Sequence, residues 1–414
     1  MVKASWSSDG STIPDVEAHT KAKHKILETY VEELIVTLYG KGRYGSTKFT
    51  FVDGFCGGGI YRDPEDGQIW AGSPVRIFQA VNRGVVKSQR KYDIDVQYIF
   101  IDSKQEHIDC LKKYTLPYFG LEKEAEGHNV KFMCDDFESV VNQCCLSVDI
   151  HKGHSFFFLD PFGWTDVSMA SIRKIRRLKK SEILFTYMID YIERFIEQRF
   201  NQLKSNFTNI LEADGFYTEA KPSRINEIGE QCYLRNESMR LFREKGEYPY
   251  VFTFSLIPRN NSRVLYYLIH MSQELTALEV MKASFWGENT LDYQYYFEIY
   301  GYGFKTSDYY QANQGELKFD INPGADQFCI NRLDASVMKI IHNCKSNELT
   351  FRELCEITIQ ENPATRQHYE ELITLKRSEQ DITVLRDGRK TTAKNLQWDD
   401  VIKVSDSKQL FLFP

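Results

Sequence analysis

The stretch KFTFVDGFCGGG, residues 48–59, decides the fold. Its first part, Lys48–Val52, is mostly aromatic or β-branched, which favours a buried strand, and a cluster of glycines follows. Glycine lets the backbone turn sharply and approach a ligand closely, where a Cβ atom would clash. In an open parallel sheet such a turn lies at the carboxyl end of the strand, where ligands bind. We therefore expect a ligand site directly after this strand.

The spacing of the glycines indicates which ligand this site would take. A dinucleotide-binding turn has the pattern G-x-G-x-x-G, and Arg62 stands where the third glycine would be. Asp53–Gly59 instead has the pattern D-x-F-x-G-x-G, which resembles the S-adenosylmethionine loop of amino-directed methyltransferases. An ordinary turn between a strand and a helix is the alternative interpretation.

Strands and helices alternate on both sides of this stretch. A helix is expected over 21–38, and another over 75–82, with Ser73 as its cap and Pro74 as its first residue. Further strands are expected at 96–101, 129–133, 155–159 and 182–188, and helices at 105–118, 138–146, 169–178 and 192–211. Strands at 251–257 and 264–270 then form an antiparallel hairpin. This order predicts a doubly wound, Rossmann-like α/β fold of the methyltransferase type, with a parallel sheet ending in an antiparallel hairpin.

The chain's 414 residues exceed the usual size of one hydrophobic core, so we expect two domains. The first spans 1–310, with an insertion at about 212–245 that matches no element of the plan. A polar stretch at 305–324, which ends in Pro323-Gly324, is the expected linker, and the second domain spans 325–414. Its expected helices lie at 332–342, 350–361 and 364–376, and its strands at 382–385 and 410–413, with a turn at Asp387-Gly388 between them. This order resembles a winged helix; a domain that only packs against the first domain or a partner is the alternative.

Composition and charge restrict the partners. A hydrophobic content of 42% is typical of a folded protein, and the net charge of −6 gives no overall attraction for nucleic acid. Local basic runs at Arg173–Lys180 and Arg386–Lys394 could bind nucleic acid or could be solvated surfaces. No apolar run is long enough to cross a membrane and no signal peptide is evident, so we expect a cytoplasmic protein. Nine cysteines without a CxxC pair favour neither a disulfide framework nor a metal site.

Acidic residues follow the second and third strands. Asp102 ends the second strand, where it could accept hydrogen bonds from both ribose hydroxyls of a nucleoside. Asp136 follows the third strand and could accept from the adenine amino group, while Phe137 packs on the ring. The alternative is that these acidic residues cap the helices that follow them.

The fourth strand ends in Asp160-Pro161-Phe162-Gly163-Trp164, which resembles the D-P-P-Y segment of methyltransferases that act on amines. There the acid and a backbone carbonyl accept hydrogen bonds from the target amine, and an aromatic ring stacks on the substrate. We therefore expect Asp160 and Pro161 to orient the amine and either Phe162 or Trp164 to stack. Upstream, Lys23-His24 resembles a pair that borders the cofactor in some ribosomal RNA methyltransferases; a surface lysine and a packing histidine are the alternative.

The segments HTKAKH, FVDGFCGGGIY, GSP, FIDS, CDDF, FLDPFGW, LYYLIH and LEVMK occur in this order over residues 19–287. In this order they resemble the bacterial three-Cys-motif partner family, which has a class I S-adenosylmethionine-dependent methyltransferase fold and a neighbouring protein with three cysteines. The resemblance implies cofactor contacts from Lys23, His24, Asp53, Gly54, Phe55, Gly57, Gly58, Gly59, Asp102, Asp136 and Phe137.

The expected activity is N-methylation of an amino group on a nucleic acid base with S-adenosylmethionine. Nucleic acid would bind through Arg173–Lys180 and the C-terminal domain. The alternatives are a methyltransferase for a small molecule or for the partner protein, and a binding module that retains the fold without transferring a methyl group.

Overall fold

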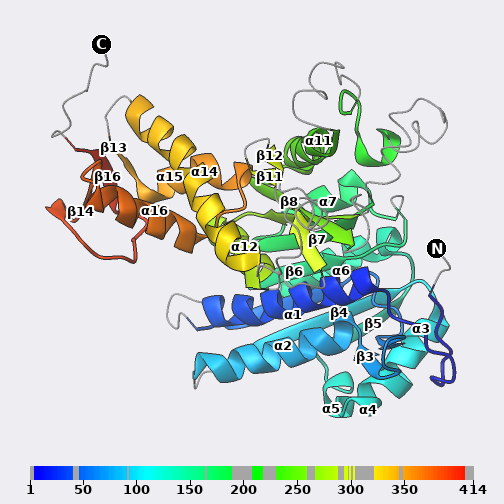
Figure 1. Ribbon diagram of the computed structural model, residues 1–414. Helices are drawn as coiled ribbons and strands as arrows, with labels where there is room; N and C mark the ends of the chain where they lie inside the picture. Colours follow the sequence, from blue (N-terminus) through cyan, green and yellow to red (C-terminus); the bar gives the residue numbers. More distant parts are fainter. Residues whose placement is uncertain are drawn as a thin grey trace. The chain divides into compact units, whose positions relative to one another are not determined.

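The computed structural model describes residues 4–40, 46–90, 93–163, 166–188, 208–217, 230–258, 266–287, 293–296, 298–299, 302–303, 321–344 and 348–405. The chain divides into two compact units, Met1–Tyr295 and Tyr296–Pro414, which are described separately below (Figure 1). No helix in these ranges is both long and apolar enough to cross a membrane.

A sheet with the strand order β10-β8-β9-β7-β6-β1-β4-β5 organises unit 1. Its strands are β1 (Lys48–Asp53), β4 (Asp95–Asp102), β5 (Val130–Cys134), β6 (His154–Leu159), β7 (Ser181–Tyr187), β8 (Tyr250–Pro258), β9 (Tyr266–Ser272) and β10 (Tyr293–Tyr296). The pairs β5-β4, β4-β1, β1-β6 and β6-β7 are parallel, while β9 runs antiparallel to both β7 and β8. A parallel sheet that ends in an antiparallel hairpin is the predicted class I methyltransferase fold, which this strand order confirms.

The helices form two layers. α1 (Ala18–Leu38) lies beside α2 (Ser73–Ser88) and also contacts α12 (Leu275–Gly287), as Figure 1 shows for α1 and α2. α6 (Phe137–His151) contacts α7 (Met169–Arg176), which contacts α11 (Glu230–Gly246). The chain builds outward from β1 through β4 to β5 and then returns to β6, and right-handed crossovers in opposite directions place their helices on opposite faces.

Helices on both faces explain why β6 and β7 are buried along their whole length. The only carboxylate in these two strands, Glu182, is compensated by side chains from neighbouring elements. His154 Nε2 lies 2.6 Å from Glu182 Oε1, His270 Nε2 lies 3.3 Å from Oε2, and the Tyr30 hydroxyl donates to Oε2. Burial alone would raise the pKa of Glu182, but the two histidines hold it below its usual range. A charged acid is therefore accommodated within an otherwise apolar strand.

Two details of unit 1 differ from the sequence predictions. α11 occupies Glu230–Gly246, almost wholly within the stretch 212–245 for which no element was expected. α2 begins at Ser73 with Gly72 as its N-cap, so Ser73 is not the cap; it is buried beside Asp53 instead. Most of the expected helix over 192–211 lies outside the described residues.

Unit 2 consists of helices followed by a small antiparallel sheet. The helices are α14 (Ile321–Asn343), α15 (Phe351–Thr358), the 3-10 turn η3 (Ile359–Glu361) and α16 (Arg366–Ser378). The sheet has the order β13-β16-β14-β15, from β13 (Glu348–Thr350), β14 (Ile382–Arg386), β15 (Arg389–Lys390) and β16 (Val401–Val404). Two short strands, β11 (Glu298–Ile299) and β12 (Tyr302–Gly303), form a separate pair.

The long connection between β14 and β16, residues 387–400, carries β15 and is called the wing below. Arg386 donates to Asp400, whose side chain is fully buried, and these bonds tie the two ends of the wing together. α14 begins at Ile321, so Pro323-Gly324 lies in its first turn, and residues 305–320 of the expected linker lie outside the described residues. A proline is tolerated in the first turn of a helix, where its missing N–H has no partner to lose. The sequence did not predict the strand β16 at Val401–Val404, and the expected strand at 410–413 lies outside the described residues.

Candidate functional site

The candidate site lies at the carboxyl ends of the parallel strands. β1 is the central strand, so Asp53 at its end has β4 on one side and β6 on the other. Residues 54–59, called the glycine loop below, are bonded to both neighbours: the Gly54 amide donates to Phe158 O at 2.9 Å and the Cys56 amide to Ile101 O at 2.9 Å. The register of the sheet therefore brings Asp53, Asp102 and Asp160 to one edge, as predicted.

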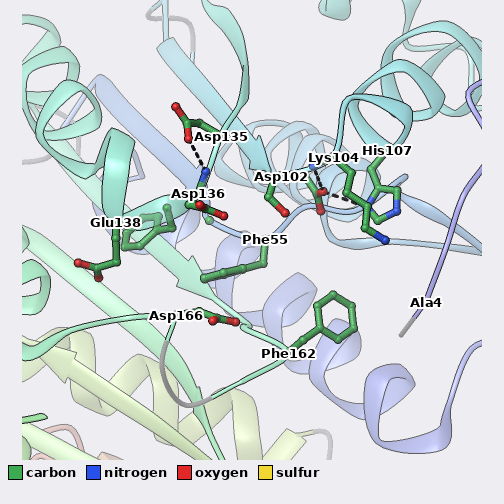
Figure 2. Close-up of a pocket in the computed structure, with 13 residues that line it drawn as sticks. Ala4, Phe55, Asp102, Lys104, His107, Asp135, Asp136, Glu138, Phe162 and Asp166 are labelled. Carbon is green, nitrogen blue, oxygen red and sulfur yellow. Dashed lines mark hydrogen bonds and ion pairs between the residues drawn. The ribbon is translucent and has the colours of Figure 1, made fainter. Parts of the chain in front are cut away.

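A cavity of about 360 Å³ opens at this edge, beside β1, β4 and β5 (Figure 2). Among the residues predicted to bind the cofactor or substrate, five line it together with the exposed ring of Phe162: Gly54, Phe55, Asp102, Asp136 and Phe137. The remaining lining residues carry no sequence prediction: Ala4, Ser103, Lys104, His107, Asp135, Glu138 and Asp166.

The lining of the cavity is rich in carboxylates. Asp102, Asp135, Asp136, Glu138 and Asp166 contribute acids, whereas the basic side chains of the lining are Lys104 and His107. Such a lining disfavours phosphate-bearing ligands and favours a ligand that carries positive charge and hydroxyl or amino donors. The Glu138 carboxylate already has protein partners, because it accepts hydrogen bonds from Ser168 and Ser171 at the start of α7.

Asp102 has the best-defined surroundings of these acids. Its Oδ1 accepts from the Lys104 amide at 2.9 Å and lies 2.9 Å from His107 Nδ1, and its Oδ2 accepts from the Gly57 amide at 3.2 Å. The carboxylate therefore connects the end of β4 to the glycine loop while it lines the cavity. Asp136 differs, because it is the N-cap residue of α6 but makes no side-chain capping bond. The capping alternative therefore does not account for its carboxylate.

Lys23 and Asp160 form an ion pair between α1 and the end of β6. Lys23 Nζ lies 2.6 Å from each Asp160 oxygen, and 6% of the lysine side chain and 18% of the aspartate side chain are exposed. Lys23 is therefore not the surface lysine of the alternative interpretation. The acid expected to orient the substrate already has a cation beside it.

His24 is buried and neutral. Burial, followed by the charges of Arg76, Lys23 and His19, holds its pKa well below the usual range. Trp70 Nε1 donates to His24 Nδ1 at 3.1 Å, so the remaining proton is on Nε2. Burial also lowers the pKa of nearby His19 to about 3, and this ring stacks on Tyr266 at 4.7 Å between centroids.

Asp53 is fully buried, and its Oδ2 has no hydrogen-bond partner among the described residues. Its Oδ1 accepts from the Phe55 amide at 3.2 Å. Burial raises the pKa of Asp53 to about 7, with Asp160 and Asp102 adding to the shift and Ser73 and the Phe55 amide opposing it. The Asp53 carboxyl is therefore buried at the end of the middle strand, and it is not among the residues that line the cavity.

The glycines of the loop are required for a reason other than the expected one. A Cβ atom at Gly58 would lie 2.4 Å from the Trp6 ring, and one at Gly57, where φ is +56°, would lie 2.8 Å from it. A Cβ atom at Gly54 would meet Leu159 and Phe137, and one at Gly59 would meet Leu111. Close packing of protein side chains therefore demands these glycines, and of the four only Gly54 lines the cavity.

The aromatic residues after β6 are only partly described. Phe162 lines the cavity with 47% of its surface exposed, and Figure 2 shows its ring beside Phe55. Pro161 is buried, and Trp164 lies outside the described residues. Of the described residues in the segment 160–164, Phe162 is thus the one that lines the cavity.

The basic run Arg173–Lys180 lies away from this edge. α7 leads back to the amino end of β7, which starts at Ser181, so the run lies at the opposite edge of the sheet, roughly 20 Å from the strand ends. Arg173 is bound to Glu212 and to Lys245 O, and Arg176 donates to Glu247 O at 2.9 Å. The exposed cations of the run are Arg177, Lys179 and Lys180.

No cluster of three or more histidine, cysteine, aspartate or glutamate side chains that could hold a metal occurs in the described part of the chain.

Two lining residues that the sequence analysis missed, Asp135 and Lys104, lie one and two residues from Asp136 and Asp102. They could have been found by extending each strand end by one or two residues. Nothing in the sequence points to Ala4.

Comparisons with known proteins give limited information. No family model and no curated protein matches the chain. Among solved structures, the plantazolicin methyltransferase BamL, in complex with an analog of desmethylPZN and SAH, is 15% identical, with 62% of this chain and 86% of BamL covered at a TM-score of 0.27. Protein LPL1258 from Legionella pneumophila is 12% identical, with 65% and 94% covered at a TM-score of 0.35.

Spermidine synthase from Thermotoga maritima is 9% identical, with 56% of this chain and 55% of the synthase covered at a TM-score of 0.27. These similarities are too weak to carry an argument. The fold assignment rests on the strand order.

Asp53 predicts a specific pH dependence of stability. Its folded pKa of about 7 lies above its ordinary value of 3.8, so the folded protein holds a proton that the unfolded chain releases between these values. The free energy of unfolding should therefore fall as pH rises from about 4 to 7, by up to roughly 4 kcal/mol from this group. Asp53→Asn should remove this contribution, as measured by urea unfolding at several pH values. Equal slopes in both proteins would contradict the assignment.

The Lys23–Asp160 pair predicts strong coupling in a double-mutant cycle. Lys23→Met should lower the free energy of unfolding by about 3 kcal/mol, because it leaves a largely buried carboxylate without its cation. Adding Asp160→Asn should recover most of that loss, as measured by chemical denaturation. Additive effects of the two changes would show that the pair does not form.

Proposed function

We propose that the protein is an S-adenosylmethionine-dependent methyltransferase. The observation that carries this proposal is the acidic cavity at the carboxyl ends of β1, β4 and β5, where Asp102 and Asp136 stand at the ends of adjacent strands. Its carboxylates match the charge and donors of this cofactor, which has a sulfonium, an ammonium, two ribose hydroxyls and an adenine amino group. Gly54, which follows Asp53, lines this cavity, so the buried Asp53 carboxyl lies close to its wall.

Each of these side chains has a role in this proposal. Asp102 accepts from the ribose hydroxyls, and its position is fixed by the Gly57 and Lys104 amides. Asp136 accepts from the adenine amino group, and Phe137 with Phe55 packs against the base. Asp53, Lys23 and His24 border the amino acid end of the cofactor. Gly57, Gly58 and Gly59 shape the loop without reaching the cavity.

The cofactor, when bound, supplies an activated methyl group, so the protein needs mainly to align the nucleophile with the methyl group and the sulfur. Asp160 and the Pro161 carbonyl accept hydrogen bonds from the target amine, and Phe162 stacks on the ring that carries it. Lys23 fixes the Asp160 carboxylate in place.

The proposed acceptor is an amino group of a nucleic acid base. The exposed ring of Phe162 at the cavity supports this choice, since a flipped-out or single-stranded base needs a stacking partner. The helix order and β13-β16-β14 pairing of unit 2 support a winged-helix domain, with Arg389, Lys390 and Lys394 exposed on its wing. The outer surface of α16 carries less positive charge for binding phosphates, because its exposed side chains include Gln367, Glu371 and Leu375.

The ordered segments that resemble the three-Cys-motif partner family support membership of that family, with its neighbouring protein as a further partner. An acidic net charge of −6 favours the second candidate, a methyltransferase for a small molecule or for that partner. We place the protein in the cytoplasm.

Methyl transfer tests the proposal directly. Incubation with methyl-labelled S-adenosylmethionine and total cellular RNA or DNA should label one polymer. Asp160→Asn should bind S-adenosylhomocysteine as the wild type does but lower the labelling at least about a hundredfold, because the amine loses its charged acceptor. Label on neither polymer, with label on a co-expressed protein or a small molecule, would favour the second candidate. Loss of cofactor binding in Asp160→Asn would refute the division of roles.

A matched pair of charge reversals tests the nucleic acid surface. Changing Arg389, Lys390 and Lys394 together to glutamate should weaken binding to labelled single-stranded RNA by about tenfold or more in fluorescence anisotropy, because phosphate contacts are lost. The control changes Arg177, Lys179 and Lys180 to glutamate, an equal charge change at the amino edge of the sheet, and should have little effect. A larger effect of the control set would place the nucleic acid there instead.

A further inference from the structure

Trp6 is buried although it lies near the start of the chain. Only 1% of its surface is exposed, and its Nε1 donates to Ile60 O at 2.5 Å. The ring meets Tyr61 and His107 edge-on, at centroid distances of 5.2 Å and 4.7 Å. An indole held by a hydrogen bond and two rings has a defined position.

The segment that carries Trp6 is fixed at its other end as well. The Val16 amide donates to Arg62 O at 2.8 Å, and the Arg62 amide donates to Pro14 O at 2.9 Å. Asp15 also forms an ion pair with Arg62. Residues 4–16 therefore run from the glycine loop, where Trp6 packs, to the end of β2 (Ile60–Arg62), where Val16 is bonded.

The glycine loop is held between Trp6 and a helical turn. On one side the indole fills the space beside Gly57 and Gly58. On the other side the buried Thr115 hydroxyl donates to Gly58 O at 2.5 Å, and Leu111 packs against Gly59. Both residues belong to the π-helical turn η2 (Leu111–Thr115), a local irregularity that is often found at functional sites.

Trp6 also contacts two of the three groups that hold Asp102. Gly57, whose amide donates to Asp102 Oδ2, packs against the indole, and His107, which lies 2.9 Å from Asp102 Oδ1, meets it edge-on. Ala4, two residues before Trp6, lines the cavity. A displacement of the indole would therefore release the loop and the Asp102 carboxylate together.

We propose that Trp6 is a positioning residue for the cofactor, which holds the glycine loop and Asp102 in their binding arrangement before the cofactor enters. The inference rests on the proposed function. It extends the site to residues 4–16, for which the sequence gives no signal. Without the indole, the loop would have to be ordered when the cofactor binds, and that ordering would lower the affinity.

The test compares three variants of the full-length protein by isothermal titration with S-adenosylhomocysteine, at a temperature well below the melting point of each. Trp6→Ala removes the indole. Trp6→Phe keeps an aromatic ring against the loop but loses the bond to Ile60 O. Tyr248→Ala is the control, because it removes a fully buried ring near Ser181, at the amino edge of the sheet.

We expect Trp6→Ala to weaken binding by about tenfold or more and Trp6→Phe to recover part of that loss, while Tyr248→Ala binds within about threefold of the wild type. Equal weakening by Trp6→Ala and Tyr248→Ala would overturn the inference, because the effect would then be one of general destabilisation. Unchanged binding by Trp6→Ala would also overturn it. A wild-type protein that binds no S-adenosylhomocysteine would overturn the proposed function, and the inference with it.

Discussion

Three carboxylates at the ends of adjacent parallel strands impose the main physical constraint on this structure. Because β1 lies between β4 and β6, the sheet brings Asp53, Asp102 and Asp160 to one edge, where like charges repel. Each acid is accommodated in a different way. Asp160 pairs with Lys23, and Asp102 accepts from two backbone amides with His107 beside it. Asp53 has a raised pKa, so it is partly protonated near neutral pH. The result is an edge that favours a cationic ligand with several donors.

Helix α1 and residues 4–16, which precede the alternating strands and helices, hold this arrangement in place. α1 contributes Lys23 to one side of the edge, and the preceding segment contributes Trp6 to the glycine loop. The part of the chain before the first strand thus supplies both the compensating charge and the packing of the site. The glycines of the loop also depend on distant segments, because without a Cβ atom they leave room for the side chains of Trp6, Phe137 and Leu111.

Sequence reasoning predicts the strands and the residues at their ends, because the alternation of apolar runs and turns indicates where the strands of a parallel sheet lie. Asp102, Asp136 and Asp160 could be placed for that reason, each directly after a strand. It could not reach contacts between distant segments, such as Trp6 on Gly58, Thr115 on Gly58 O, or Lys23 on Asp160. Nor could it separate Arg173 and Arg176, which bind the protein itself, from the exposed cations of the same run. α11 was missed because the polar residues Arg235 and Ser238 interrupt the apolar pattern of its buried face, although the buried positions recur at helical spacing.

The central claim is that the acidic cavity at the strand ends receives S-adenosylmethionine. Hydrogen–deuterium exchange followed by mass spectrometry, with and without the cofactor, tests this most directly because it reports where the chain is protected. We expect slower exchange in three separate peptides, which cover residues 54–58, 102–107 and 135–137, and no change across Arg173–Lys180. Exchange that stays unchanged in all three peptides at saturating cofactor, or protection confined to other parts of the chain, would contradict it.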